Sequence, residues 1–246
     1  MTSPPAPTHV AVDIAVEVAV DSVAGVRTAR TAGADRVELC AGLGLGGLTP
    51  SLALVESAVA AADGLPVLVL LRPTTGGFVH DADDAAQVVR DADLVLRAGA
   101  SGVVVGPVTG AGQVDVAVLR RLHDVVADRG ALVFHRAVDV VDDLEAAIEV
   151  LVGLGVDRVL TSGGAARAGD GMPRIDRALR AAAGRLAVMA GGGVRPEDIA
   201  ALTDAGLHDV HLSGRVLVAP DAGFGATYRT DGAVVAAAVA AARRVG

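Results

Sequence analysis

Short apolar, β-branched runs recur about every 20 to 30 residues along this chain, and Ala-rich stretches of helical character separate them. The runs are continuously apolar rather than alternating, which predicts strands buried on both faces, as in a parallel sheet. We expect strands at residues 14–20, 35–40, 66–72, 101–105, 131–136, 157–161, 186–190 and 208–213. Eight strand–helix units in 246 residues favour an α/β fold of the (β/α)₈ or TIM-barrel kind over an open doubly wound sheet.

Helix signals agree with this reading. Thr49-Pro-Ser51 and Asp142-Asp-Leu-Glu145 are typical helix starts, and phrases such as Ala32-Gly-Ala-Asp-Arg36 place a glycine of positive φ where a helix returns to a strand. Helices are expected at residues 22–32, 51–63, 82–98, 115–128, 142–153, 173–184, 196–205 and 232–244. No linker is visible, so we expect a single domain at residues 11–246, preceded by a flexible, proline-containing arm at residues 1–10.

Composition excludes several classes of protein. A net charge of -8 argues against nucleic acid or an anionic membrane as a partner. All 21 basic residues are arginine, so a Schiff-base aldolase, which needs a lysine amine, is excluded. No apolar run reaches the roughly 18 residues of a membrane span, and nothing at the N-terminus indicates export. With one cysteine, the chain fits a reducing compartment, and we expect a cytoplasmic protein.

Polar residues gather where the predicted strands end. In a barrel of this kind the carboxyl ends of the strands carry the chemistry. An acid on each of two adjacent strands, with arginine and histidine on others, predicts a polar cluster in which Glu38 and His135 form an acid–base pair and Arg72 or Arg136 orients charge. A buried salt-bridge network that plugs the barrel is the alternative. The candidate catalytic residues are Glu17, Glu38, Arg72, His135, Arg136, Asp139, Ser162 and His211.

Glycines follow the seventh and eighth predicted strands, the position at which barrels commonly bind phosphate. Backbone amides freed by glycine form a nest for anions, although glycine also simply permits tight turns. The candidate anion-binding residues are Gly191, Gly192, Gly193, Ser213 and Gly214. The earlier run Gly42-Leu-Gly-Leu-Gly-Gly47 lacks the spacing and the acidic partner of a dinucleotide fingerprint, so no nucleotide cofactor is expected.

Metal binding is weakly supported by the residues. Copper(I) prefers at least two thiolate or thioether ligands, and Cys40 is the only thiol. Met189 belongs to a strand and is better explained by packing. Glu38 with His135 and His211 could suit a divalent ion. We therefore expect no strong copper(I) site within one chain, while a site shared between subunits stays open.

The phrases Ala34–Ser51, Leu132–Asp139, Arg158–Gly164, Leu71-Arg-Pro73 and Ala190–Arg195, with the His211 strand, resemble the CutC family from about residue 14 onward. The resemblance implies a cytosolic TIM barrel, a homo-oligomer (dimer or tetramer), a role in copper homeostasis, and the polar residues above, with Cys40, as the barrel mouth. Two departures stand out. Val18-Ala-Val20 replaces the cysteines common in relatives, and Arg72–His80 lacks an arginine, an aspartate and a tyrosine of their loop.

Three functional hypotheses remain. The resemblance implies a cytoplasmic protein that binds or traffics copper. The residues favour an uncharacterised barrel enzyme that uses acid–base chemistry on a small anionic or phosphorylated substrate, held at the loops after strands 7 and 8. A binding scaffold without catalysis is the third. In each case the partner is a small molecule or a metal ion.

Overall fold

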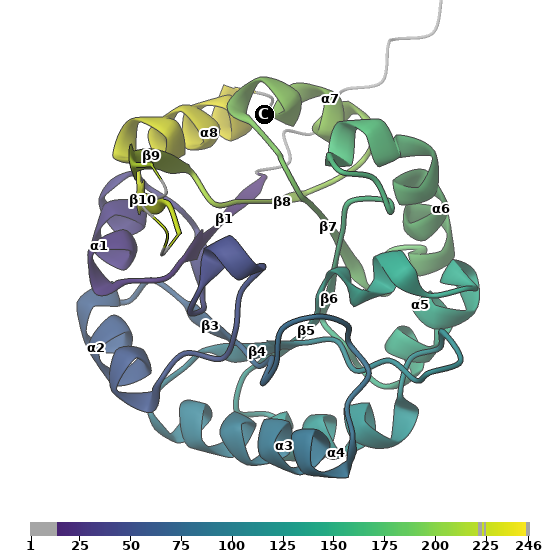
Figure 1. Ribbon diagram of the computed structural model, residues 1–246. Coiled ribbons are helices and arrows are strands. Elements are labelled where there is room, and N and C mark those ends of the chain that lie inside the picture. The colour runs from purple at the N-terminus through teal and green to yellow at the C-terminus, as the bar shows by residue number, and fades with distance from the viewer. Residues whose placement is uncertain (1–13, 221–222, 224, 245–246) are drawn as a thin grey trace, which may run out of the picture.

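Eight parallel strands close into a barrel in the order of the sequence, and helices surround it (Figure 1). This computed structural model describes residues 14–220, 223 and 225–244. The strands are β1 (Ala15–Val20), β2 (Arg36–Leu39), β3 (Val67–Leu70), β4 (Gly102–Val105), β5 (Ala131–Phe134), β6 (Arg158–Thr161), β7 (Ala187–Gly191) and β8 (Asp209–Leu212). Because β1 pairs with β8 as well as β2, the sheet has no edge there. The single-domain TIM barrel expected from the sequence is confirmed.

The helices begin near the predicted signals. Ser51 accepts a hydrogen bond from the Leu54 amide at the start of α2, and Asp143 does the same for Ala146 at the start of α5. Gly33, after α1, has a φ of 85°, as predicted for a helix-ending glycine. The helices are α1 (Val23–Thr31), α2 (Leu52–Ala62), α3 (Ala82–Arg97), α4 (Val116–Val126), α5 (Leu144–Gly153), α6 (Met172–Ala182), α7 (Ile199–Asp204) and α8 (Gly232–Arg244).

Short elements that were not predicted lie in the loops. Two antiparallel strands, β9 (Arg215–Ala219) and β10 (Thr227–Thr230), form a hairpin between β8 and α8, beside α1 (Figure 1). Its residues are mostly exposed, so the hairpin has no buried period that a sequence reading can detect. Single turns of 3₁₀ helix are η1 (Leu43–Leu45), η2 (Arg136–Val140), η3 (Ala168–Gly171) and η4 (Pro196–Asp198).

The interior of the barrel is layered. At the amino ends of the strands, Arg36 binds Glu17 (Nε to Oε2, 2.6 Å) and also Asp209, which Arg158 approaches to 3.3 Å. Met189 is fully buried in this layer and its sulfur accepts a hydrogen bond from Arg36, in agreement with a packing role. Apolar side chains from β3, β4 and β5 fill the next level. Beyond these layers, two cavities open at the carboxyl ends of the strands.

Two expectations concern the ends of the chain and the membrane. The flexible arm at residues 1–10 lies outside the described residues, as does the start of the predicted domain at residues 11–13. Among the helices of the described residues, none has the length and apolar character needed to cross a bilayer.

Candidate functional site

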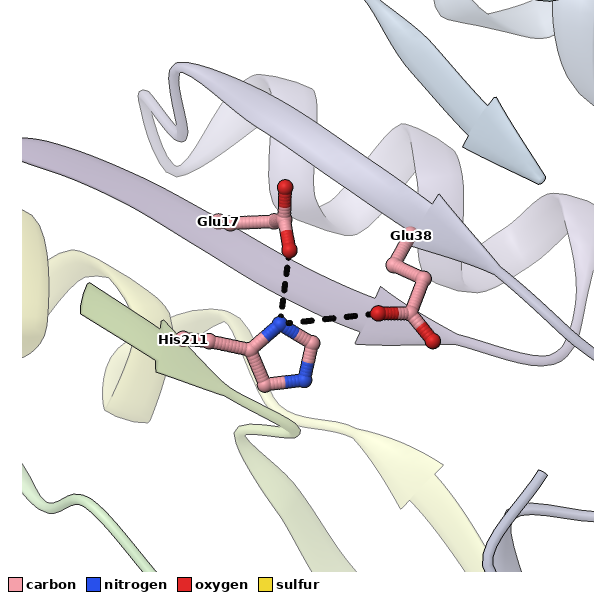
Figure 2. Close-up of side chains that lie close together, drawn as sticks. All are labelled: Glu17, Glu38 and His211. Carbon is pink, nitrogen blue, oxygen red and sulfur yellow. Dashed lines mark hydrogen bonds and ion pairs between the residues drawn. The ribbon is translucent and has the colours of Figure 1, made fainter. Parts of the chain in front are cut away.

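Glu17, Glu38 and His211 meet inside the barrel from the neighbouring strands β1, β2 and β8 (Figure 2). Strand register causes this meeting, because Glu17 lies opposite His211 and Ala19 lies opposite Glu38. Nδ1 of His211 lies 2.7 Å from Oε1 of Glu17 and 3.8 Å from Oε2 of Glu38. The sequence analysis placed all three at the mouth and paired Glu38 with His135 as acid and base, whereas the structure brings Glu38 beside His211.

Their surroundings shift the pKa values of Glu17 and Glu38 in opposite directions. Burial raises the pKa of Glu17, but the hydrogen bond and charge of His211 and the charge of Arg36 outweigh it and lower that pKa to about 2. Burial and the neighbouring Glu17 raise the pKa of Glu38 to about 7, against the opposing charge of His211. Burial lowers the pKa of His211, but the two glutamates outweigh this effect and raise it. Glu17 is therefore a fixed anion that favours the protonated form of His211, and Glu38 is a group that titrates near neutral pH.

Glu38 differs from Glu17 in its partners. Both oxygens of Glu17 are hydrogen-bonded, one to His211 and one to Arg36. Oε2 of Glu38 is buried and makes no hydrogen bond in the described part of the chain. The 3.8 Å contact of this oxygen with Nδ1 of His211 is too long for a hydrogen bond, so Glu38 is the less satisfied of the two buried carboxylates. Glu38 and His211 both line a cavity of about 440 Å³ at the carboxyl ends of the strands.

Arg72 holds the wall of this main cavity together. Its guanidinium donates to the carbonyls of Gly47 (3.1 Å) and Gly76 (2.6 Å), and so ties the loop after β2 to the loop after β3. Arg72 lines the same cavity, and its buried Nε has no hydrogen-bond acceptor in the described residues. Arg72 thus positions two loops and keeps one donor unused.

His135 is buried against aromatic and cationic neighbours. Its Nδ1 accepts a hydrogen bond from the Ala137 amide (3.1 Å), and its ring centre lies 4.9 Å from that of Phe78. Burial, with the charge of Arg72, lowers the pKa of His135 to about 3. The ring is therefore neutral at physiological pH. The sequence reading expected a histidine that titrates near neutrality, and the desolvation of this position explains the difference.

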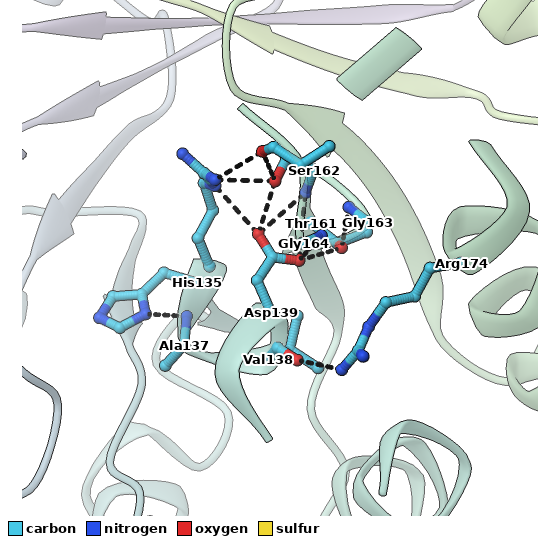
Figure 3. Close-up of polar contacts among 11 residues, drawn as sticks. His135, Ala137, Val138, Asp139, Thr161, Ser162, Gly163, Gly164 and Arg174 are labelled. Atoms are coloured by element: carbon cyan, nitrogen blue, oxygen red, sulfur yellow. Dashed lines mark hydrogen bonds and ion pairs between the residues drawn. The ribbon is translucent and has the colours of Figure 1, made fainter. Parts of the chain in front are cut away.

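Asp139 organises the loop after β6 (Figure 3). Its carboxylate accepts hydrogen bonds from the Thr161 hydroxyl (2.5 Å), the amides of Ser162 (3.1 Å) and Gly164 (3.1 Å), and Nε of Arg136 (3.0 Å). Nη2 of Arg136 also donates to the Ser162 hydroxyl (2.7 Å). Asp139 and Ser162 are saturated by these contacts, so they fix Arg136 at the cavity rather than face a ligand themselves.

A second cavity of about 320 Å³, here called the arginine cavity, adjoins the first. Four of the five residues predicted to bind an anion line it, namely Gly192, Gly193, Ser213 and Gly214. Gly191 does not line it, and a Cβ at Gly191 would lie 2.4 Å from Cδ1 of Leu160. The absence of a side chain at Gly191 is thus a packing requirement.

Comparison with known proteins decides the family. A model of the CutC family matches residues 14–216. This chain belongs to the CutC family. It is 44% identical to a family protein CutC of Agrobacterium fabrum (strain C58) over 203 residues, which cover 82% of this chain and 80% of that protein. It is 43% identical to a family protein CutC of Xanthomonas axonopodis pv. citri (strain 306) over 208 residues, which cover 83% and 85%.

A solved CutC structure shares the fold. The Streptococcus agalactiae protein, described as a candidate copper homeostasis protein, superposes with a TM-score of 0.75 and 27% identity, covering 81% of this chain and 98% of that chain. The resemblance inferred from the sequence is therefore confirmed at the level of family and fold.

Copper is the metal that the description of this CutC neighbour names, and the donors of this chain can be tested against it. Cys40 lines the main cavity, but its Sγ lies 3.7 Å from the Val20 carbonyl, and burial raises the pKa of the thiol. The sulfur of Met189 is bound to Arg36. No second sulfur joins Cys40 among the residues that the structure describes, so the donor set does not fit copper(I). Glu17, Glu38 and His211 bring donor atoms within 4.8 Å of one another without a thiol.

Several cavity residues were not singled out by the sequence reading. Leu43, Leu45, Phe78, Val140 and Leu160 make the main cavity largely apolar beside its polar groups. They come from four different loops and strands, so no local spacing signals them. Only Phe78 could have been noticed in the sequence, because it is one of three phenylalanines in a chain with few aromatic residues.

Proposed function

We propose that this CutC-family chain is an enzyme that moves a proton on a small anionic molecule at the barrel mouth. The observation that carries the proposal is the buried carboxyl group of Glu38, whose Oε2 makes no hydrogen bond and lies 3.8 Å from a histidine that a second carboxylate holds. A carboxyl group and a histidine on the wall of one cavity can act as base and acid toward the same substrate. A carboxyl group with a pKa of about 7 is well suited to accept a proton near neutral pH.

The roles follow from the contacts. Glu38 as a carboxylate takes the proton from a C–H or O–H group of the substrate. His211, whose Nδ1 is bound to Glu17, uses its other ring nitrogen to donate a proton to the substrate oxygen that gains charge. Glu17 is a positioning residue that keeps His211 protonated and oriented. Arg72 and Arg136 line the same cavity and favour an anionic substrate. The enzyme is restored when Glu38 gives its proton back to the substrate and His211 takes a proton back from the substrate oxygen.

Proton abstraction can be tested without knowing the product. Small hydroxy acids, keto acids and sugar phosphates are incubated with the protein in D₂O, and loss of substrate C–H signal is followed by NMR. We expect exchange with at least one compound, at a rate that rises with pH through about 7 as Glu38 loses its proton. Glu38→Gln should slow the exchange at least about 100-fold.

The matched control is Glu56→Gln, which changes an exposed glutamate of α2 and should leave the rate unchanged. Exchange that survives Glu38→Gln, or a complete absence of exchange across the compounds, would contradict the proposal.

Copper handling is the competing function, and the description of the Streptococcus agalactiae protein is what supports it. It predicts that copper(I) raises the thermal midpoint saturably and that Cys40→Ser abolishes the rise. Measurements with copper(I), copper(II), zinc(II) and inorganic phosphate need a dye, since the chain has no Trp. Because the described donors around Cys40 do not suit copper(I), we expect no shift with copper(I). A shift lost in Cys40→Ser would replace our proposal with the copper function.

Two further expectations belong to this proposal. We expect a cytoplasmic protein, because a single thiol fits a reducing compartment. We also expect a homo-oligomer, as the CutC resemblance implies. Light scattering coupled to size-exclusion chromatography measures the second, and a mass of one chain would contradict it.

A further inference from the structure

The arginine cavity opens onto the main cavity. Ala19, Leu43, Arg136, Leu160 and His211 line both. His211, the proposed acid, therefore stands at the junction. We propose that the arginine cavity holds the phosphate group of a phosphate monoester whose carbon skeleton enters the main cavity. This inference rests on the proposed function for the chemistry of the skeleton, but the phosphate site itself is independent of it.

Charge is the first support. Arg136, Arg195 and Arg215 line the arginine cavity, and no Asp or Glu does. Elsewhere in this chain of net charge -8, arginines such as Arg36, Arg177 and Arg185 lie within 3 Å of a carboxylate oxygen. Arg195 approaches Glu197 only to 3.8 Å, and Arg215 stacks on the ring of Tyr228 at 4.5 Å. Two of the three guanidinium groups thus keep donors for an anion, and arginine matches the oxygens of a phosphate well.

Backbone geometry is the second support. Gly193, Val194 and Gly214 line the arginine cavity, and their amides donate no hydrogen bond within the part of the chain that the structure describes. Gly192 has a φ of 100°, and a Cβ there would lie 3.2 Å from Cζ of Arg136. A side chain would therefore separate Arg136 from the loop. Successive free amides beside arginines make a concave site for a group with several anionic oxygens.

The residues that line the main cavity indicate the chemistry of the rest of the ligand. The lining residues include Glu38, whose buried acceptor Oε2 makes no hydrogen bond, and Arg72, whose buried donor Nε makes none either. A ligand that satisfies both carries a hydroxyl or an acidic C–H for Glu38 and a carbonyl or hydroxyl oxygen for Arg72. With a phosphate in the adjoining cavity, this is a small phosphorylated hydroxy or carbonyl compound.

Binding of inorganic phosphate and of glycerol phosphate to the full chain, measured by calorimetry at constant ionic strength, tests the site. We expect saturable binding of both, and at least about tenfold weaker binding of acetate, which offers fewer anionic oxygens. Arg195→Glu puts a carboxylate in the arginine cavity and should weaken both phosphate ligands at least about tenfold. Arg180→Gln, on an exposed arginine of α6, is the control and should change neither.

Further variants separate the two parts of the inference. Glu38→Gln should leave the affinity for inorganic phosphate within about twofold, so failure of the acid–base proposal does not bear on the phosphate site. Arg72→Gln should weaken glycerol phosphate but not inorganic phosphate. No saturable phosphate binding, or equal binding by Arg195→Glu and the native chain, would overturn the phosphate site. Equal weakening of both ligands by Arg72→Gln would overturn the placement of the carbon skeleton.

Discussion

Glu38 shows what a single buried carboxyl group does to this barrel. Its side chain is 9% exposed, and burial beside Glu17 raises its pKa from 4.5 to about 7. The folded protein therefore holds a proton on Glu38 that the unfolded chain releases near pH 4.5. A group of this kind contributes stability that is complete below pH 4.5 and is lost as the pH rises through about 7.

This linkage predicts a pH-dependent effect of Glu38→Gln. At pH 8 the native chain carries a buried, charged Glu38 and the variant does not, so the variant should be more stable by roughly 2 to 3 kcal/mol. At pH 4.5 the two should be nearly equal. Urea unfolding of both proteins at the two pH values measures the difference. A constant difference between the proteins would show that Glu38 does not titrate in this range.

Arg72 acts on two whole loops. Its guanidinium joins the carbonyls of Gly47 and Gly76, which lie in the loops after β2 and β3, and stacks on Phe78 with Cζ 5.2 Å from the ring centre. The cation replaces water as the partner of these carbonyls. The two loops form the rim of the main cavity, so their order and the shape of the cavity depend on one side chain.

Removal of this contact should loosen both loops and little else. In Arg72→Gln we expect amide hydrogen exchange to accelerate about tenfold or more at residues 43–47 and 74–78, because the local opening cost falls. The strand amides of β5 should exchange as before and serve as the internal control. Unchanged protection in both loops would mean that their own backbone contacts are sufficient.

A layer of buried ion pairs fills the barrel near the amino ends of its strands. Asp209 of β8 binds Arg36 of β2 and lies near Arg158 of β6, so one carboxylate links strands from different sides of the barrel. All three side chains are largely buried, with exposures of 10 to 19%. Loss of one partner leaves buried charges without compensation.

We therefore expect Asp209→Ala to lower the free energy of unfolding by about 3 kcal/mol or more. Asp176→Ala removes an exposed acid of α6 that also contacts an arginine, and should cost less than about 1 kcal/mol. Denaturant unfolding of the two variants compares them directly. Similar losses in both would show that the buried layer adds no more than a surface pair.

The sequence was sufficient for the barrel because strand burial and helix capping are local. The run around Val103 to Val105 is buried on both faces wherever it lies in the barrel, and Ser51 caps α2 from three residues away. The β9–β10 hairpin was not predicted, since its exposed strands carry no such local pattern. The polar residues of the mouth were also recognisable, because each follows or ends an apolar strand.

Their partnerships were decided by tertiary structure. Glu17 and His211 are 194 residues apart, and only the closure of β1 on β8 brings them to 2.7 Å. In the same arrangement Oε2 of Glu38 makes no hydrogen bond, while His135, equally prominent in the sequence, is buried beside Arg72 and is neutral. Residue type states what a group can donate or accept. Its charge and its partner depend on desolvation and on neighbours from distant strands, which the order of residues does not contain.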